Sequence, residues 1–210
     1  MANDNHVVYA KNLTDVFYYL KTIQGLKILG SGTAEQHLHF SEQLALDQTA
    51  LFLRNIEELK QIDKKERYID FGSASTLSSM IDVGRKKLPS VLYEALISTA
   101  NPLVRNIATL GGNICSNERK MTLFAPLLAL DAKLEFKSSM QDSLFIPVSK
   151  FEEIKPLHIL SRIRVPIEDW DVAIFKKLGP AGGITSESAS FTFLAQSEKE
   201  KVWREMARQI

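Results

Sequence analysis

The sequence contains a single cysteine, Cys115. No disulfide can form within the chain, and no all-cysteine iron–sulfur or zinc site can be built from it alone. A lone cysteine is typical of a reducing compartment. Long apolar runs are also missing, since none approaches the roughly 18–20 residues of a membrane-spanning helix. The first residues, MANDNHVVYAKN, lack the apolar core of a secretory signal. We therefore expect a cytoplasmic protein without membrane contact.

An excess of charge of either sign is absent as well. The formal net charge is +1, which gives no electrostatic reason to expect binding to nucleic acid. Hydrophobic residues make up 45% of the chain and charged residues 24%, as in ordinary globular proteins that fold around a buried core. A small-molecule ligand or a protein partner is the better expectation.

Strand-like and helix-like segments follow one another along the chain. Period-two alternation and β-prone runs predict strands at 6–10, 26–29, 50–53, 67–71, 133–136, 159–165 and 190–194. Helical spacing and capping residues predict helices from Asn12 or Thr14 to Thr22, over 56–62, from Ser75 or Thr76, from Pro89, and over 123–130 and 197–210. The segment 177–183 has the composition of a turn-rich joint. This order indicates an α+β fold.

Two glycine-rich segments stand out, Gly30-Ser31-Gly32-Thr33 and 109–113, TLGGN. Glycine lets a ligand approach the backbone closely, and successive N–H groups in such a turn form a concave anion site. Two such turns would hold the pyrophosphate of a dinucleotide from both sides. A plain turn, or a bulge at the Gly-Gly pair, explains the same residues. The first segment is not a Rossmann fingerprint, because Glu35 stands at the place of the third glycine.

Four segments resemble, in their residues and their order, the flavin subunits of molybdenum hydroxylases, a family that includes xanthine dehydrogenase and aerobic carbon monoxide dehydrogenase. The most specific is VRNIATLGGNI at 104–114, close to the family's "IRN-x-AT-[IL]-GGNI". APLLALDAKL follows at 125–134 with the family's spacing. ILGSGT at 28–33 resembles the "LLAGGT" loop, and IDFGSAST at 69–76 resembles "I-GA-x-x-T".

The resemblance implies a two-lobed FAD-binding domain of the PCMH/VAO type, with FAD between the lobes. It implies a first α/β lobe over 1–60, a second over 61–167 and a shortened C-terminal domain over 168–210, since only about 45 residues remain after the strand that Pro166 ends. The expected cofactor-binding residues are Ile28, Leu29, Gly30, Ser31, Gly32, Thr33, Ala34, Glu35, Thr109, Leu110, Gly111, Gly112, Asn113, Thr122, Leu160 and Lys177.

In the family the flavin takes electrons from iron–sulfur clusters on a partner and usually passes them to NAD. The resemblance therefore implies a molybdopterin-binding large subunit and a 2Fe-2S small subunit as partners, with NAD as the acceptor. Because the cofactor carries the chemistry, we expect no side-chain acid, base, nucleophile or metal ligand in this chain.

The chain departs from the family pattern at several positions. Ser31 stands where glycine is usual, and Ala34 replaces an acidic residue. Thr122 takes the place of the aspartate that contacts the cofactor in relatives, and Ala181 replaces an arginine. These departures leave a second function open, a scaffold or assembly subunit that kept the fold and lost the cofactor.

Other residues allow two interpretations each. Cys115 is either near the flavin or an inert buried thiol. Arg105 is suited equally to a phosphate and to a structural ion pair. The pair His37 and His39 has metal-ligand spacing only on a strand, and a solvated pair at a helix edge is the more usual case.

Overall fold

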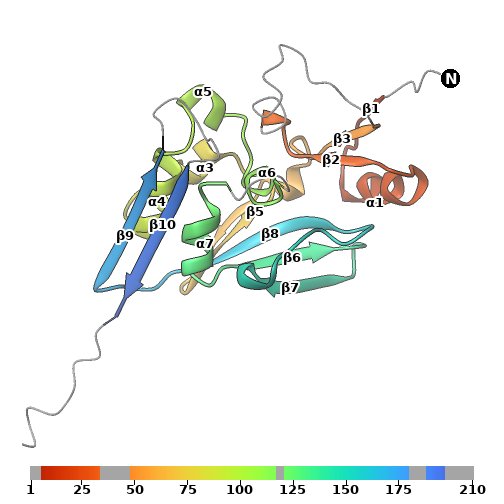
Figure 1. Cartoon of the computed structure of the whole chain (residues 1–210). Helices are drawn as coiled ribbons and strands as arrows, with labels where there is room; N and C mark the ends of the chain where they lie inside the picture. Colours follow the sequence, from red (N-terminus) through yellow and green to blue (C-terminus); the bar gives the residue numbers. More distant parts are fainter. Residues whose placement is uncertain (1–5, 34–47, 117–120, 180–187, 197–210) are drawn as a thin grey trace, which may run out of the picture.

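A computed structural model describes residues 6–33, 48–116, 121–179 and 188–196, and within them the chain forms three sheets. Figure 1 shows a small sheet with one helix at one end of the molecule, a two-stranded hairpin at the other, and a five-stranded sheet with its helices between them. No helix among these residues combines the length and the apolar character that a membrane span requires.

The small sheet has the strand order β1-β3-β2, with β1 at Val7–Val8, β2 at Lys27–Leu29 and β3 at Ala50–Phe52, all parallel. Helix α1, Leu13–Thr22, connects β1 to β2. The Asn12 side chain begins this helix, because its Oδ1 accepts a hydrogen bond of 3.0 Å from the Asp15 N–H. Of the two predicted capping residues, Asn12 and Thr14, the structure thus confirms Asn12.

One hydrophobic cluster holds the small sheet and α1 together. It includes Val16 and Phe17 of α1, Leu51 of β3, and Leu59 of a 3-10 turn, Glu57–Leu59. Ala74 and Ile159, which come from much later in the chain, complete it. The cluster therefore joins the small sheet to the larger one.

The larger sheet is antiparallel and has the order β4-β5-β8-β6-β7. Its strands are β4 Ile62–Lys64, β5 Tyr68–Gly72, β6 Lys133–Lys137, β7 Ser143–Pro147, followed by a 3-10 turn at Val148–Lys150, and β8 Ile159–Pro166. Between β5 and β6 the chain forms α3 Leu77–Asp82, α4 Ser90–Ile97, α5 Pro102–Arg105, α6 Leu110–Ile114 and α7 Phe124–Ala129.

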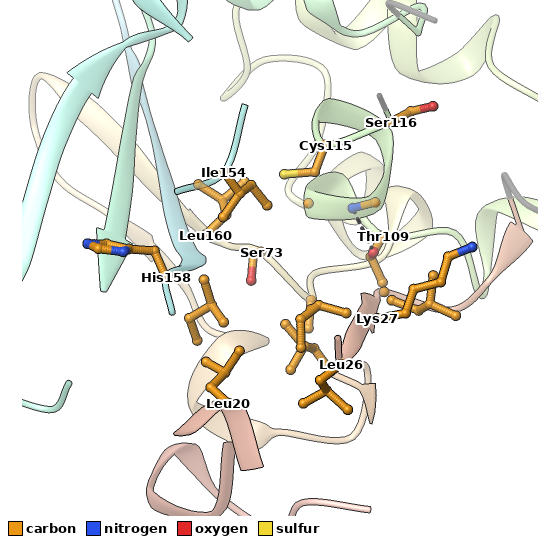
Figure 2. A pocket seen from close by; sticks show the side chains of 18 of the residues that line it. Leu20, Leu26, Lys27, Ser73, Thr109, Cys115, Ser116, Ile154, His158 and Leu160 are labelled. Atoms are coloured by element: carbon orange, nitrogen blue, oxygen red, sulfur yellow. Dashed lines mark hydrogen bonds between the residues drawn. The ribbon is translucent and has the colours of Figure 1, made fainter. Parts of the chain in front are cut away.

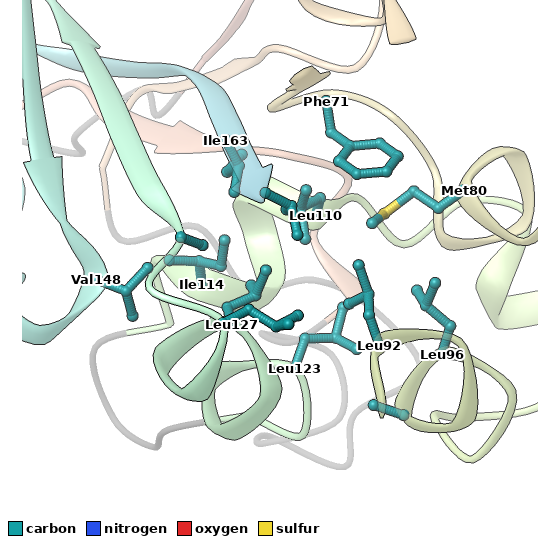
Figure 3. Close-up of a cluster of buried hydrophobic side chains, with 14 of the residues drawn as sticks. Phe71, Met80, Leu92, Leu96, Leu110, Ile114, Leu123, Leu127, Val148 and Ile163 are labelled. Carbon is teal, nitrogen blue, oxygen red and sulfur yellow. The ribbon is translucent and has the colours of Figure 1, made fainter. Parts of the chain in front are cut away.

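One face of this sheet is apolar and packs against the helices. Alternate residues of its central strands point to that side and are buried: Ile69, Phe71, Leu134, Phe136, Ile163 and Val165. All six belong to one cluster with residues of the helices, and Figure 3 shows Phe71 and Ile163 of the sheet beside Met80 of α3, Leu92 and Leu96 of α4, and Leu110 and Ile114 of α6. Each fully buried leucine contributes about 1.5–3 kcal/mol relative to an exposed one, so this cluster is a large part of the fold's stability.

The other face of the sheet carries a charged network centred on Asp70, whose exposed fraction is 3%. The Arg164 guanidinium donates to both carboxylate oxygens of Asp70 at 2.8 Å, and Arg162 donates to Oδ2 at 3.3 Å. The hydrogen bond that Arg164 donates to Asp70 raises the pKa of Arg164. The Arg164 guanidinium also lies 4.0 Å from the Tyr68 ring centroid. The network links β5 to β8.

The hairpin consists of β9, Val172–Leu178, and β10, Ala189–Ala195, and packs against α4 and α7. The predicted strand at 190–194 is confirmed. The expectation of a turn-rich joint over 177–183 is partly wrong, because Lys177 pairs with Ser190 and Leu178 with Ala189. β9 ends at Leu178, which pairs with the first residue of β10, and 180–183 lie outside the described residues.

The expected helix over 56–62 is also wrong. The segment forms a single 3-10 turn and then enters β4. Two of its backbone carbonyls accept hydrogen bonds from residues at and just after the end of β5. The Gly72 N–H donates to Gln61 O at 2.8 Å and the Ala74 N–H to Leu59 O at 2.8 Å. Tertiary hydrogen bonds therefore prevail over helical spacing in so short a run. The helix expected over 197–210 and the pair His37 and His39 lie outside the described residues.

Arg105 forms no ion pair among the described residues, and its contact with a phosphate stays a prediction. Its guanidinium donates to the backbone carbonyls of Ile97, Thr99 and Ala100 at 2.9–3.1 Å. These carbonyls lie at the C-terminus of α4, where cations are favoured by unpaired acceptors and by the helix dipole. Arg105 thus fixes the start of the VRNIATLGGNI segment against α4.

Candidate functional site

A cavity of about 660 Å³ lies where the small sheet meets the larger one. Most of its lining comes from β2 and the loop after it, the residues after β5, helix α6, and the approach to β8 (Figure 2). Ten expected binding residues are among the lining: Ile28, Leu29, Gly30, Ser31, Gly32, Thr33, Thr109, Gly111, Gly112 and Leu160. The fold therefore brings the two glycine-rich segments to one cavity, although they are far apart in the sequence.

The two segments touch each other at Gly30. A Cβ atom on this residue would collide with the Thr109 Oγ1, which leaves no room for any other side chain. Thr109 is held in place as the N-cap of α6, where its Oγ1 accepts a hydrogen bond of 3.2 Å from the Gly112 N–H. Glycine at position 30 is thus required by the close approach of the β2 loop to α6.

The N–H groups at the start of α6 are all bonded within the protein. Leu110 and Gly111 donate to the carbonyls of Ser75 and Ser73 at 2.9 and 2.7 Å. Gly112 donates to the Thr109 Oγ1, and Asn113 to the Thr109 carbonyl. Of the two segments expected to bind an anion through their N–H groups, only the β2 loop can do so without breaking internal hydrogen bonds. The Thr109–Asn113 segment presents a closely packed glycine surface and no unpaired donors.

The β2 loop has the opposite character. The N–H groups of Ser31, Gly32 and Thr33 form no hydrogen bond with another described residue. The Ser31 Oγ is buried and likewise lacks a partner among these residues. Donors that converge on a cavity from one turn are suited to an anion such as a phosphate.

Four expected binding residues do not line the cavity. Leu110 is fully buried in the core beneath it, and Thr122 is buried with an exposed fraction of 3%. The Asn113 Oδ1 accepts a hydrogen bond of 3.3 Å from the Leu123 N–H, so this side chain braces the segment after α6. The Lys177 Nζ donates to Ser98 O at 3.2 Å, at the C-terminus of α4. Ala34 and Glu35 lie outside the described residues.

Several lining residues were not expected from the sequence. Ser73 follows β5 directly, and the loop Glu153–His158 precedes β8. Ser73 belongs to one of the four family-like segments, so its place beside Gly72 in that segment is the sequence feature that could have identified it as a lining residue. The loop has no motif, and only the fold shows that it closes one side of the cavity. Cys115 lines the cavity as well, next to α6.

Lys177 gives a prediction for stability against pH. Burial lowers the pKa of Lys177 from its ordinary value of 10.5. The unfolded chain then binds this proton more tightly, so the contribution of Lys177 to the free energy of unfolding rises with pH from the lowered pKa up to about 10.5. Urea unfolding of the wild type and Lys177→Met, compared from pH 7 upward, should give a difference that grows in favour of the wild type. If the free energies of unfolding of the two proteins change with pH in parallel, the prediction is wrong. A loss of FAD affinity in the variant would support a cofactor role for Lys177.

The fold and the cavity place the chain in a class of flavin-binding domains. The chain belongs to the family described as the FAD binding domain in molybdopterin dehydrogenase, which matches residues 3–168. It is 32% identical over 148 residues to the xanthine dehydrogenase FAD-binding subunit of Escherichia coli O157:H7, an alignment that covers 68% of this chain and 49% of that protein. The chain thus spans about half the length of this relative.

Solved structures share the fold at lower identity. A carbon monoxide dehydrogenase from Hydrogenophaga pseudoflava matches with a TM-score of 0.73 and 19% identity, over 83% of this chain and 63% of that chain. Quinoline 2-oxidoreductase from Pseudomonas putida 86 matches with a TM-score of 0.71 and 18% identity, over 85% and 64%. The expected two-lobed α+β FAD-binding fold is confirmed.

FAD is the cofactor that this family implies, and three features of the cavity fit it. The volume of about 660 Å³ lies within the range of cofactor pockets. The β2 loop lines the cavity and its N–H groups form no hydrogen bond with another described residue, which leaves them available to a pyrophosphate. The Ser31 and Ser73 hydroxyls, both buried, lack partners among the described residues and are available to a polar ligand.

Proposed function

We propose that this chain is the FAD-binding, electron-transfer subunit of a multi-subunit molybdopterin dehydrogenase of the xanthine dehydrogenase type. The observation that carries the proposal is the meeting of both glycine-rich segments at one cavity, with unpaired donors on one wall and a glycine surface on the other. Bound FAD would supply the redox chemistry, while the chain's own residues bind and orient it.

Different residues around the cavity would have different roles in binding FAD. The N–H groups of Ser31, Gly32 and Thr33 would hold the pyrophosphate, with the Ser31 hydroxyl as a further donor. Gly111 and Gly112, which both line the cavity, would lie along the cofactor. Leu160 and the loop Glu153–His158 would exclude water from the opposite side.

The partners and the acceptor are part of the same proposal. Electrons would come from a 2Fe-2S subunit, which receives them from a molybdopterin-binding large subunit, and would pass through FAD to NAD in the cytoplasm. The two hydrophobic clusters support lobes over 1–60 and 61–167, joined by the contacts of Ala74 and Ile159. The expected roles of Thr122 and Lys177 are not part of the proposed site, since neither residue lines the cavity.

Binding of FAD to the purified chain tests the proposal directly. The loaded protein should be yellow, with flavin absorbance near about 450 nm. FAD at about 100 times its dissociation constant should stabilise the fold by about 2.7 kcal/mol, which corresponds to a rise in melting temperature on the order of 5–10 °C. A colourless protein with no thermal shift would overturn the proposal and favour the cofactor-free scaffold. Bleaching of the 450 nm band by NADH tests the assignment of NAD separately.

A further inference from the structure

Ser73 is fixed in the cavity wall by its backbone and leaves its hydroxyl unused. Its N–H donates to Ser161 O of β8 at 3.0 Å, and its carbonyl accepts from the Gly111 N–H of α6 at 2.7 Å. Its exposed fraction is 5%. The Oγ is buried and has no hydrogen-bond partner among the described residues. Figure 2 shows it directed into the space that the lining residues enclose.

The surroundings of this hydroxyl are mostly apolar. Leu160, Ile154 and Leu20 line the cavity on the same side of α6. A phosphate is a poor occupant here, because Ser73 offers one hydroxyl only and its N–H is already bonded to Ser161. A flat heteroaromatic ring fits better, since its faces pack on aliphatic side chains while a nitrogen or carbonyl at its edge takes one hydrogen bond.

The Ser73 hydroxyl is buried without a partner among the described residues. A buried polar group without a partner is destabilising, and native proteins leave few of them. A ligand that satisfies the hydroxyl accounts for its presence in an otherwise apolar wall.

We propose that Ser73 is a ligand-positioning residue whose Oγ hydrogen-bonds the edge of a heteroaromatic ring of the cofactor. This inference rests on the proposed FAD binding. The ring is either the isoalloxazine or the adenine, which share a flat shape and polar edge atoms. The hydrogen bond fixes the position of the ring along the wall between α6 and Leu160.

Ser73→Ala tests the inference, with Ser75→Ala as the matched control. Ser75 is two residues away, is 1% exposed, and donates its hydroxyl to Lys60 O at 3.1 Å. Ser73→Ala should weaken FAD binding about fivefold and leave the unliganded chain as stable as the wild type or more so. Ser75→Ala should do the reverse, with a lower melting temperature and unchanged affinity.

Competition by riboflavin and by adenosine identifies the ring. A weaker riboflavin competitor in Ser73→Ala assigns the hydroxyl to the isoalloxazine, and a weaker adenosine competitor assigns it to the adenine. If the wild type binds FAD and Ser73→Ala binds it equally well, the inference is wrong while the proposed function stands. A destabilised Ser73→Ala chain with unchanged affinity would likewise assign Ser73 a purely structural role. If the wild type does not bind FAD, the proposed function itself fails.

Discussion

Replacing Gly30 with alanine is expected to weaken FAD binding by about fivefold to about 150-fold. The new Cβ would collide with the Thr109 Oγ1, and the Gly112 backbone is only 3.5 Å from the same position. Either the β2 loop moves away from α6 or Thr109 gives up its cap on the helix. Overpacking of this kind costs about 1–3 kcal/mol, and each 1.4 kcal/mol lost in the bound geometry is a factor of about ten in affinity. Titration of the purified variant with FAD, followed by flavin fluorescence, measures the loss.

A double-mutant cycle shows whether this collision is the cause. Thr109→Ala removes the oxygen atom that a Cβ on residue 30 would meet, at the cost of the helix cap, about 1 kcal/mol. Adding Gly30→Ala to Thr109→Ala should then reduce affinity much less than adding it to the wild type, because the two residues are in contact. Strictly additive losses would show that contact with Thr109 is not the cause of the weaker binding.

Asp70→Ala is expected to destabilise the fold by about 3 kcal/mol. Asp70 receives three hydrogen bonds from Arg162 and Arg164, and its removal leaves two guanidinium groups without their shared carboxylate. Breaking a buried ion pair usually costs about 3–5 kcal/mol. The lower end of this range applies because the arginine side chains are 40% and 31% exposed and can turn to water. Urea unfolding followed by circular dichroism gives the change in the free energy of unfolding.

Asp63→Ala provides the control for the loss of one carboxylate. Asp63 pairs with Lys65 at 2.9 Å, and both side chains are more than half exposed. Exposed ion pairs contribute about 0–1 kcal/mol, so this variant should unfold almost as the wild type does. Equal losses in the two variants would mean that net charge, and not the buried network across β5 and β8, determines the stability.

Much of the fold could be predicted because its signals are local. The cap at Asn12, the alternation in β5 and β8, and the helix from Pro89 each depend on residues close together in the sequence. The errors occurred where distant residues decide the outcome. The segment after Ile56 became a turn and a strand because the N–H groups of Gly72 and Ala74 take its carbonyls. Helical spacing cannot report a hydrogen bond to another part of the chain.

The features of the site likewise divide into those that local sequence could predict and those that depend on distant residues. The two glycine-rich segments could be found from composition and from the family resemblance, and the fold brings them together at Gly30 and Thr109. Which N–H groups remain available could not be predicted, because that depends on the carbonyls of Ser73 and Ser75 reaching α6 from a separate segment. The Ser73 hydroxyl was missed for the same reason: its burial is a property of packing, which no local pattern encodes.

The complete internal bonding of the α6 N–H groups has a consequence for the order of biosynthetic events. A wall whose donors are satisfied by Ser73, Ser75 and Thr109 needs no ligand to acquire its shape. This wall then loses little conformational entropy when the cofactor binds, which lowers its share of the cost of association. The chain can therefore fold first and be loaded with its cofactor later, so that newly made protein and cofactor supply need not be synchronised in the cell.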